Sequence, residues 1–308
     1  MNLLSSLDEF VGKDQIKNNL SVFLDSAKKQ NRPLEHCLFY GLPGTGKTTL
    51  AKLIAIELGT KIRILQGTSI QKPIDVINLL LSCNDRDVIF IDEIHAINKT
   101  CFELFYSAME EQVLDLNIGK DFNTKITRIK LPNFTLIGAT TSLGKIPQPL
   151  EDRFGITFNL NEYTEQEMNE IVDLYANKLK VNLSKDDIQL INRASKGIPR
   201  ICYRLIRRIK DFQTSHNQIN INEILKRLGY IYHEYDINDL HYLQLLAKNP
   251  NGVGLKTISQ IINIDLLSIE LKIEPYLLQK GLVNKQAKGR VITKQGLELL
   301  NLISSKSN

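Results

Sequence analysis

The residues best suited to chemistry lie near the start of the chain, where positions 41–48 read GLPGTGKT. This is the complete G-x-x-x-x-G-K-[ST] spacing, in which backbone N–H groups wrap phosphates and a following helix adds its positive dipole end. Lys47 would reach the β- and γ-phosphates of ATP, and Thr48 would ligate Mg²⁺. A chance glycine-rich turn is the alternative, but the segment lies between an expected strand and an expected helix, as the motif requires. The glycines of this loop are Gly41, Gly44 and Gly46.

Two acids follow an apolar run, and a second such run ends in threonines. Residues 87–91 are followed by Asp92 and Glu93, which a buried strand would deliver to the ligand crevice of an open α/β sheet. Asp92 would hold Mg²⁺, and Glu93 would orient and deprotonate the attacking water, so ATP hydrolysis is favoured over simple binding. Thr141 follows the other run, where its hydroxyl would touch the γ-phosphate or the water; an ordinary strand end is the equal alternative.

Two arginines are candidates for contact with nucleotide phosphates. Arg153 lies where the sheet should end and could serve a neighbouring subunit as an arginine finger, although a surface salt bridge is the commoner role of such a residue. Arg200 opens a helix after Pro199 and could face the ATP phosphates. It shares one helix face with other basic residues, which would contact DNA or a neighbouring subunit, although a solvated face is the alternative. These residues are Lys196, Arg204 and Arg208.

A second basic cluster lies near the end of the chain, where residues 280–294 contain five basic residues and no acid. On a β-hairpin such a cluster would contact the phosphate backbone of DNA without reading its sequence. A solvated loop is the alternative explanation. The five residues are Lys280, Lys285, Lys288, Arg290 and Lys294.

The first half of the chain has the pattern of an α/β sheet domain. Apolar runs that read as strands alternate with helical patterns, and this order predicts a parallel sheet covered on both faces. A polar, alternating stretch at residues 113–131 predicts a β-hairpin that projects from the sheet. The expected strands are residues 36–40, 61–65, 87–91 and 134–138, and the helix after the phosphate loop is 48–58, which ends at Gly59.

The second half has two further textures. Residues 164–179, 184–194 and 199–212 predict a small helical domain without strands. After Gly229, helices near 237–247, 256–262 and 266–279 precede a hairpin within 281–293, which is the outline of a winged helix. The expected domains are therefore 1–159, a P-loop ATPase domain; 160–229, a helical lid; and 230–308, a DNA-binding winged helix.

Composition narrows the class of protein further. The 308 residues are 43% hydrophobic and 24% charged, with a net charge of +5, which suits a globular protein and permits a nucleic-acid partner. Apolar runs are too short to span a membrane, and the N-terminal residues do not resemble a signal peptide. The four cysteines have neither disulfide-framework nor zinc spacing, so a cytoplasmic protein is expected.

Taken in order, these motifs resemble those of the AAA+ ATPases. Closer similarity is to the RuvB family, the bacterial motors of Holliday-junction branch migration, and it extends over nearly the whole chain. The segments that carry it include LPG at 42–44, IDEIH at 91–95, LIGATT at 136–141, DRFGI at 152–156 and EPYL at 274–277. The resemblance implies a large AAA+ domain, a lid and a winged helix. It also implies hexameric rings on duplex arms, with RuvA as loading partner and RuvC as resolving nuclease where present.

The resemblance also assigns roles to individual residues. The phosphate and Mg²⁺ site would comprise Gly44, Lys47, Thr48 and Thr49, and the hydrolytic residues Asp92, Glu93, Thr141, Arg153 and Arg200. Further residues expected at the nucleotide are Glu110, Glu111, Gln112 and Tyr163; the wing's DNA contacts would be Lys285 and Arg290, and the hairpin at 117–130 would dock RuvA. The chain departs from the family pattern at residues 3–4 and at Leu42, Thr45, Gln112, Glu151 and Lys285.

Two other classes share part of this pattern. A clamp-loader-like switch or a protein remodeller of the AAA+ class would have the same ATP chemistry, and a DNA-binding adaptor would bind nucleotide without hydrolysing it. The basic wing favours DNA as the substrate of the motor. The intact acid pair, Asp92 and Glu93, argues against the adaptor.

Overall fold

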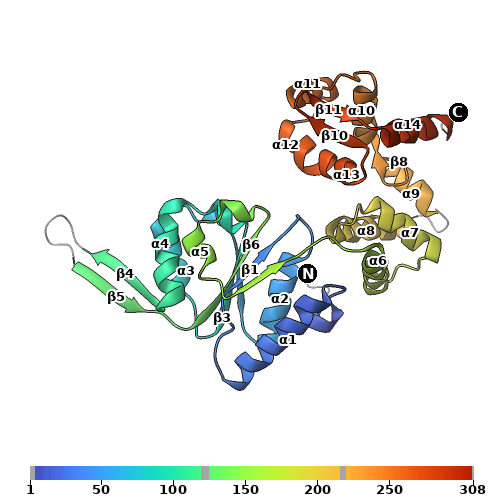
Figure 1. Cartoon of the computed structure of the whole chain (residues 1–308). Helices are drawn as coiled ribbons and strands as arrows, with labels where there is room; N and C mark the ends of the chain where they lie inside the picture. Colours follow the sequence, from blue (N-terminus) through green and yellow to red (C-terminus); the bar gives the residue numbers. More distant parts are fainter. Residues whose placement is uncertain (1–3, 119–124, 216–219, 307–308) are drawn as a thin grey trace. The chain divides into compact units, whose positions relative to one another are not determined.

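The computed structural model describes residues 4–118, 125–215 and 220–306. Their contacts divide the chain into two compact units. The first unit extends to Ile171 and also includes Ile198–Arg200, and the second contains Val172–Gly197 together with the residues from Ile201 onward. Figure 1 follows the chain through both.

A five-stranded parallel sheet forms the centre of the first unit. Its strand order is β2-β3-β6-β1-β7, and every neighbouring pair is parallel. The strands are β1 (Cys37–Tyr40), β2 (Ile62–Gln66), β3 (Asp87–Asp92), β6 (Phe134–Thr140) and β7 (Ile156–Asn159). The predicted parallel sheet is thus confirmed. The fifth strand, β7, was not predicted: it has four residues at the edge of the sheet, and its alternation is too short to distinguish it from a loop.

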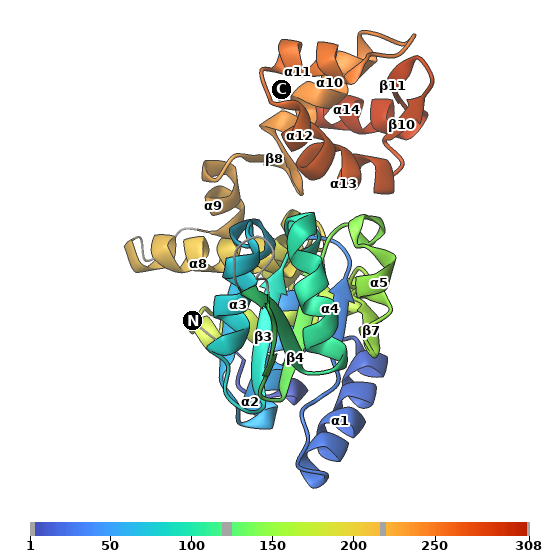
Figure 2. The same ribbon diagram turned by 90° about the vertical axis from the view of Figure 1, so that its left-hand side faces the viewer.

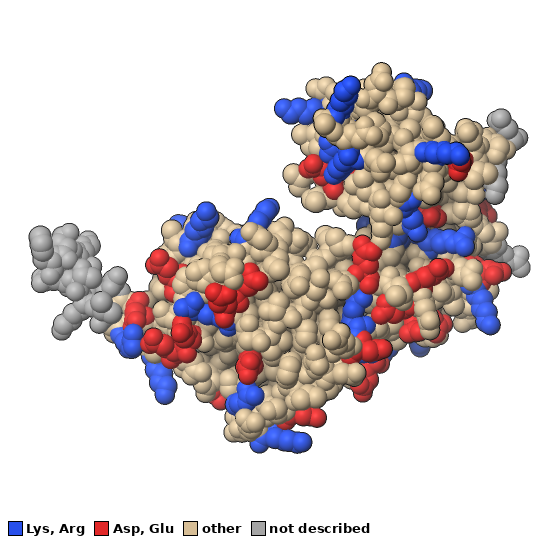
Figure 3. All heavy atoms as spheres, viewed as in Figure 1, with Lys and Arg blue, Asp and Glu red and all other residues tan. Residues whose placement is uncertain are grey.

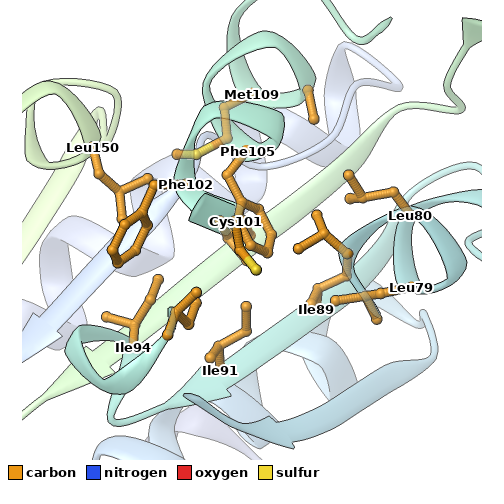
Figure 4. Close-up of a cluster of buried hydrophobic side chains, with 14 of the residues drawn as sticks. Leu79, Leu80, Ile89, Ile91, Ile94, Cys101, Phe102, Phe105, Met109 and Leu150 are labelled. Atoms are coloured by element: carbon orange, nitrogen blue, oxygen red, sulfur yellow. The ribbon is translucent and has the colours of Figure 1, made fainter. Parts of the chain in front are cut away.

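Helices cover both faces of this sheet. They are α1 (Asp14–Lys29), α2 (Lys47–Leu58), α3 (Pro73–Leu81), α4 (Phe102–Glu110) and α5 (Gln148–Glu151). Ile89 and Ile91 of β3 pack with the apolar faces of α3 and α4. Phe102 and Phe105 of α4 belong to this cluster (Figure 4). Figures 1 and 2 show α3 and α4 together on one side of the sheet and α2 on the other. This core holds the carboxyl ends of the strands in a fixed arrangement.

The predicted hairpin after α4 is present as a separate two-stranded sheet. Strand β4 (Val113–Ile118) pairs antiparallel with β5 (Lys125–Lys130), and Figure 1 shows the pair leading away from the central sheet. Residues 119–124, within the segment expected to dock RuvA, lie outside the described residues. At its base, Arg128 of β5 forms ion pairs with Asp115 at 2.7 Å and with Glu111 at 3.2 Å.

Helices follow the sheet, as predicted. They are α6 (Glu165–Leu179), α7 (Lys185–Ala194), α8 (Pro199–Ser215) and α9 (Ile221–Arg227). Among the described residues between 160 and 229 there is no strand. Ser184 caps α7 by accepting a hydrogen bond from the backbone N–H of Asp187, whose carboxylate in turn accepts from the N–H of Ser184.

The last part of the chain has the predicted winged-helix outline with three additions. A small sheet, β8 (Tyr230–Tyr232) with β9 (Tyr235–Asp236), precedes it, and α14 (Lys294–Lys306) follows it. The third expected helix contains a π-helical turn, Ile269–Ile273, between α12 (Leu266–Ser268) and α13 (Glu274–Gln279). The other elements are α10 (Ile237–Ala247), α11 (Leu255–Ile262), β10 (Val283–Gln286) and β11 (Gly289–Ile292).

The four cysteines are free thiols with buried side chains; they are Cys37, Cys83, Cys101 and Cys202. Burial raises the pKa of each thiol, to about 11 for Cys83 and about 12 for Cys202. Among the described residues, no helix combines the length and apolar character needed to cross a membrane.

Candidate functional site

The phosphate-loop motif occupies the turn between β1 and α2, as the sequence predicts. Gly41, Gly44 and Gly46 all have positive φ angles, of 138°, 82° and 105°. At Gly46, the last residue before α2, a β-carbon would lie 3.0 Å from the ring of Phe10, so both the backbone angle and the space require glycine. The positive φ angles let the loop curl at the N-terminus of α2, an arrangement suited to anions.

Lys47 is held inside this loop. Its side-chain Nζ donates hydrogen bonds to the carbonyl oxygens of Gly41 and Leu42, both at 2.8 Å, and the residue is only 6% exposed. Burial lowers the pKa of the Lys47 ammonium, the carboxylates of Glu93 and Asp92 act in the opposite direction, and Arg200 adds to the lowering. The two acids and Arg200 therefore act on Lys47 through their charges and in opposite directions.

Glu93 and Thr141 meet at the carboxyl ends of β3 and β6. The Thr141 hydroxyl lies 3.1 and 3.0 Å from the two carboxylate oxygens of Glu93, and its backbone N–H donates to Oε2 at 3.0 Å. Glu93 itself has a left-handed backbone, with φ of 50°. The hydroxyl of Thr141 therefore orients the carboxylate that the sequence predicts to act on water.

His95 joins this cluster, although the sequence analysis gave it no role. Its Nδ1 lies 2.8 Å from the hydroxyl of Thr140 and 3.2 Å from Oε2 of Glu93. Thr140 is fully buried, so this contact fixes the imidazole beside the acid. The signal in the sequence was the short spacing, because His95 is two residues beyond Glu93 and the intervening turn brings it back to the strand end.

The order of the strands explains why these residues converge. Strand β6 lies between β1 and β3 and is hydrogen-bonded to both. Because parallel strands end at one edge, the phosphate loop, Thr141 and the acid pair all emerge there. Asp92 accepts a hydrogen bond from the backbone N–H of Glu93 at 3.2 Å and lies 3.5 Å from the side-chain nitrogen of Gln66.

Further predicted nucleotide residues surround the same loop. Thr48 and Thr49 lie in the first turn of α2 and are partly buried. Tyr163 donates its hydroxyl to the carbonyl oxygen of Thr45 at 2.9 Å. Arg200 lies beside Gly44, where an added β-carbon would come within 3.2 Å of the arginine Cβ.

Arg153 and Glu110 form a group of their own between α5 and α4. The Arg153 Nη2 lies 2.7 Å from Oε2 of Glu110, Nη1 donates to the carbonyl of Pro149 at 2.6 Å, and the guanidinium lies 4.8 Å from the ring centroid of Tyr106. The expected salt-bridge alternative for Arg153 is therefore present within one chain. Next to Glu110, Glu111 pairs with Arg128, and Gln112 accepts the N–H of Leu131 on its carbonyl at 2.8 Å.

The basic face predicted on α8 divides into residues with different surroundings. Lys196, which precedes that helix, forms a 2.5 Å ion pair with Asp239, a residue only 1% exposed. Arg208 pairs with Asp211 at 3.1 Å on the surface. Lys196 is thus a largely buried cation held by Asp239, so the interpretation of all these residues as one solvated or DNA-facing surface is wrong for it.

The wing carries the two predicted DNA contacts on facing strands. Lys285 of β10 pairs directly with Arg290 of β11, and the side chain of Lys285 is 49% exposed. Lys288, in the turn between the strands, and Lys280 and Lys294 on either side of the hairpin are exposed. In Figure 3, Lys and Arg side chains gather on the visible face of this part of the molecule.

The chain combines a phosphate loop after β1, a threonine after the adjacent strand β6 and an acid pair at the end of β3 with a helical part and a winged helix. Together these features define an AAA+ P-loop ATPase. Matches to family models identify the family within this class. Residues 4–160 match the Holliday junction DNA helicase RuvB P-loop domain, residues 163–229 the RuvB AAA lid domain, and residues 235–301 the RuvB C-terminal winged helix domain. The chain belongs to the RuvB family.

Individual relatives agree with this assignment. A protein of Ureaplasma urealyticum, named Holliday junction branch migration complex subunit RuvB, is 46% identical over 296 residues, which are 96% of this chain and 94% of the relative. A protein of the same name from Campylobacter hominis is 44% identical over 97% of this chain and 89% of its own length. The solved structure of the Thermotoga maritima RuvB Holliday junction branch migration motor has a TM-score of 0.81 at 36% identity, covering 98% of this chain and 99% of that one.

Proposed function

We propose that this chain is an ATP-driven DNA motor for Holliday-junction branch migration in recombination and repair, acting as a hexameric ring. The proposal rests on the presence of two sites in one chain. One is the cluster of Lys47, Glu93 and Thr141, and the other is a basic winged helix. The motor class rests on the first, and DNA as its track rests on the second together with the names of the relatives.

In the proposed ATP site, backbone N–H groups at Gly44 and Gly46 receive the phosphates and Lys47 exchanges its loop carbonyls for phosphate oxygens. Gly41 shapes the start of the loop, because its own N–H donates to the carbonyl of Thr140 at 3.3 Å. Asp92 and Thr48 offer the hard oxygen donors that Mg²⁺ prefers, with Thr49 beside them. When bound, Mg²⁺ would neutralise charge on the β- and γ-phosphates. Glu93, oriented by Thr141, accepts a proton from the attacking water.

The remaining roles concern the environment of the nucleotide and the neighbouring subunit. Arg200 faces the phosphates from beside Gly44, and Tyr163 supports the loop at Thr45. Arg153 stabilises charge on the nucleotide of the adjacent subunit, as an arginine finger does. Residues 110–112, which are Glu110, Glu111 and Gln112, line that same composite site.

On the DNA side, Lys285 and Arg290 contact the phosphate backbone of duplex arms without reading bases. The β4–β5 hairpin docks RuvA, and RuvC resolves the junction where it is present. The proposed boundaries are 1–159 for the ATPase domain, 160–229 for the lid and 230–308 for the winged helix. The proposed location is the cytoplasm.

The test is ATP-dependent dissociation of a synthetic four-way junction by the full chain, with and without a RuvA protein. Dissociation should require ATP and the partner. Lys47→Ala should abolish nucleotide binding and junction dissociation, whereas Lys61→Ala, an exposed lysine before β2, should preserve both. ATP hydrolysis without any junction processing in the presence of RuvA would favour an AAA+ switch or remodeller instead.

A second variant tests the hydrolytic assignment. Glu93→Gln keeps the shape of the side chain but removes the base, so it should bind ATP normally and lose turnover. Nucleotide binding is measured by equilibrium titration and turnover by phosphate release. Normal turnover in Glu93→Gln would contradict the assignment of Glu93.

A further inference from the structure

The two cations of the wing face each other across the hairpin. Lys285 and Arg290 occupy opposite positions of the β10–β11 register. Like charges placed directly opposite in an antiparallel pair destabilise it. A wing with this pair therefore needs a negative charge nearby to hold its shape.

Glu274 supplies that charge from beneath the hairpin. Its Oε1 accepts hydrogen bonds from Nε of Arg290 at 2.7 Å and from the Tyr242 hydroxyl at 2.8 Å. Its Oε2 lies 2.8 Å from Nζ of Lys285 and 3.3 Å from Nη2 of Arg290. One carboxylate therefore binds both wing cations.

Burial makes this arrangement rigid. Glu274 and Tyr242 are both 0% exposed, and the side chain of Arg290 is 17% exposed. Burial alone raises the pKa of the Glu274 carboxyl, but hydrogen bonds from Arg290, Lys285 and Tyr242 outweigh it and leave the pKa below its usual value. The carboxylate is charged and fully engaged at neutral pH.

The backbone places Glu274 at this point. It is the first residue of α13, directly after the π-helical turn Ile269–Ile273, and π-turns often occur where a functional side chain is positioned. Arg290 is also fixed through its backbone, which forms two hydrogen bonds with Val253 at 2.9 and 3.0 Å. The wing is thereby fastened to the helices at both its strands.

After their contacts with Glu274, Lys285 and Arg290 each retain N–H donors that can bind an external ligand. The Lys285 ammonium has three N–H donors, of which Glu274 engages one, and half of its side chain is exposed. Arg290 donates hydrogen bonds to Glu274 from its Nε and from one N–H of Nη2, and its Nη2 also lies 3.6 Å from Glu270. Its remaining N–H groups keep a fixed direction because the guanidinium is planar and anchored.

We propose that Glu274 is the positioning residue of the wing, which holds Lys285 and Arg290 in the spacing that contacts successive phosphates of duplex DNA. This inference rests on the proposed DNA-binding function of the wing. Glu274 acts through the two cations and does not touch DNA itself, since it is completely buried.

The positioning role predicts a change in DNA affinity opposite to the change expected from charge alone. Removing a negative charge from a DNA-binding surface strengthens attraction to phosphates. If Glu274 positions the cations, Glu274→Gln must instead weaken DNA binding, because the two like charges separate and lose their fixed spacing. Glu270→Gln is the matched control: it lies in the preceding helical turn and removes a charge near the same arginine, but its side chain is 47% exposed.

The experiment measures binding of the full chain to a fluorescently labelled random-sequence duplex at several salt concentrations. Glu274→Gln should weaken binding about tenfold, the lower range for losing one hydrogen bond to a charged group. It should also reduce the salt slope by about one, the value for one lost phosphate contact. Glu270→Gln should bind as tightly as the unaltered chain or more tightly. ATP turnover without DNA should be unchanged in both.

A second variant protects the test against loss of folding. Tyr242→Phe removes only the hydroxyl that holds Glu274, and Tyr242 is buried away from any DNA. It should weaken DNA binding by about twofold to fivefold, the lower part of the net contribution of one hydrogen bond, because the charged carboxylate keeps its contacts with both cations. A purely structural role for Glu274 would lower the melting temperature of these variants without changing the DNA affinity or the salt slope of the folded protein.

Two results would overturn the inference, and they are distinguishable. If Lys285→Ala and Arg290→Ala weaken DNA binding but a folded Glu274→Gln or Tyr242→Phe does not, the wing binds DNA and the positioning role alone is wrong. If Lys285→Ala and Arg290→Ala leave DNA binding unchanged, the wing is not the DNA surface, and both the proposed contacts and this inference fail.

Discussion

Replacing Glu110 with glutamine should increase ATP turnover. Arg153, the proposed arginine finger, is bound within its own chain by Glu110 at 2.7 Å, by the carbonyl of Pro149 and by the ring of Tyr106. To reach a neighbouring subunit's nucleotide, the guanidinium must leave Glu110. Its Nε is also buried without a hydrogen-bond partner among the described residues, which makes the present position less than fully satisfied.

The size of the effect follows from exposure. The side chains of Arg153 and Glu110 are 28% and 64% exposed, and ion pairs of this kind contribute about 0.2–1 kcal/mol. As a Boltzmann factor, this range corresponds to an increase of about 1.4- to 5-fold in the ratio of released to bound arginine. The free energy of unfolding should fall by less than about 1 kcal/mol, because the pair is largely solvated.

The assay is steady-state ATP hydrolysis by the full chain with duplex DNA, with kcat and KM determined separately. Glu103→Gln is the control, since Glu103 is exposed and lies seven residues earlier on the same helix, α4. An unchanged or lower kcat in Glu110→Gln would refute the restraining role of Glu110. A rise in KM alone would mean that Glu110 contributes only to the lining of the composite nucleotide site and does not restrain Arg153.

Two further predictions concern stability. Burial lowers the pKa of His36 to about 4, so between about pH 6.5 and pH 4 the unfolded chain binds a proton that the folded chain does not. The free energy of unfolding should therefore fall by about 2 kcal/mol between pH 7.5 and pH 5. In thermal melts, His36→Gln should reduce this dependence of stability on pH. Gly46→Ala should cost about 1–3 kcal/mol and weaken ATP binding, because φ is 105° and the new methyl would meet Phe10. Gly59→Ala, where φ is 66° and the space is open, should cost only about 1–2 kcal/mol and leave ATP binding intact.

The parts of the fold that could be predicted from the sequence are those defined by local patterns of residues. The phosphate loop, the buried strand before Asp92 and the hairpin at 113–131 each depend on neighbours in the chain, so periodicity and turn residues reveal them. Strand β7 was missed because its four residues are stabilised by pairing with β1, more than a hundred residues earlier. The π-turn before Glu274 was missed because an apolar helix pattern does not distinguish one extra residue in a turn.

Contacts between segments that are distant in the sequence determine the partners of the site residues. Nothing near Arg153 in the sequence indicates Glu110, because the pair forms only when α4 and α5 pack together. Glu274 and Arg290 are similarly joined by the fold of the winged helix. The residue types at both sites were evident from the sequence; their partners were not. The roles assigned to these residues stay predictions until the variants are measured.

The position of β1 between β6 and β7 has a consequence for how the protein is made. Both of its hydrogen-bonding partners come later in the chain: Cys37 aligns with Ile137 on one side and with Ile156 on the other. At about 5–20 residues per second, a ribosome needs roughly 6–24 s to add the roughly 120 residues between β1 and the end of β7. Until β6 has been made, the apolar strand before the phosphate loop has no neighbouring strand, and its second neighbour, β7, is completed only at Asn159. We therefore expect the nascent chain to gain its affinity for ATP late and abruptly, once Asn159 has left the ribosome, and to depend on chaperones until then.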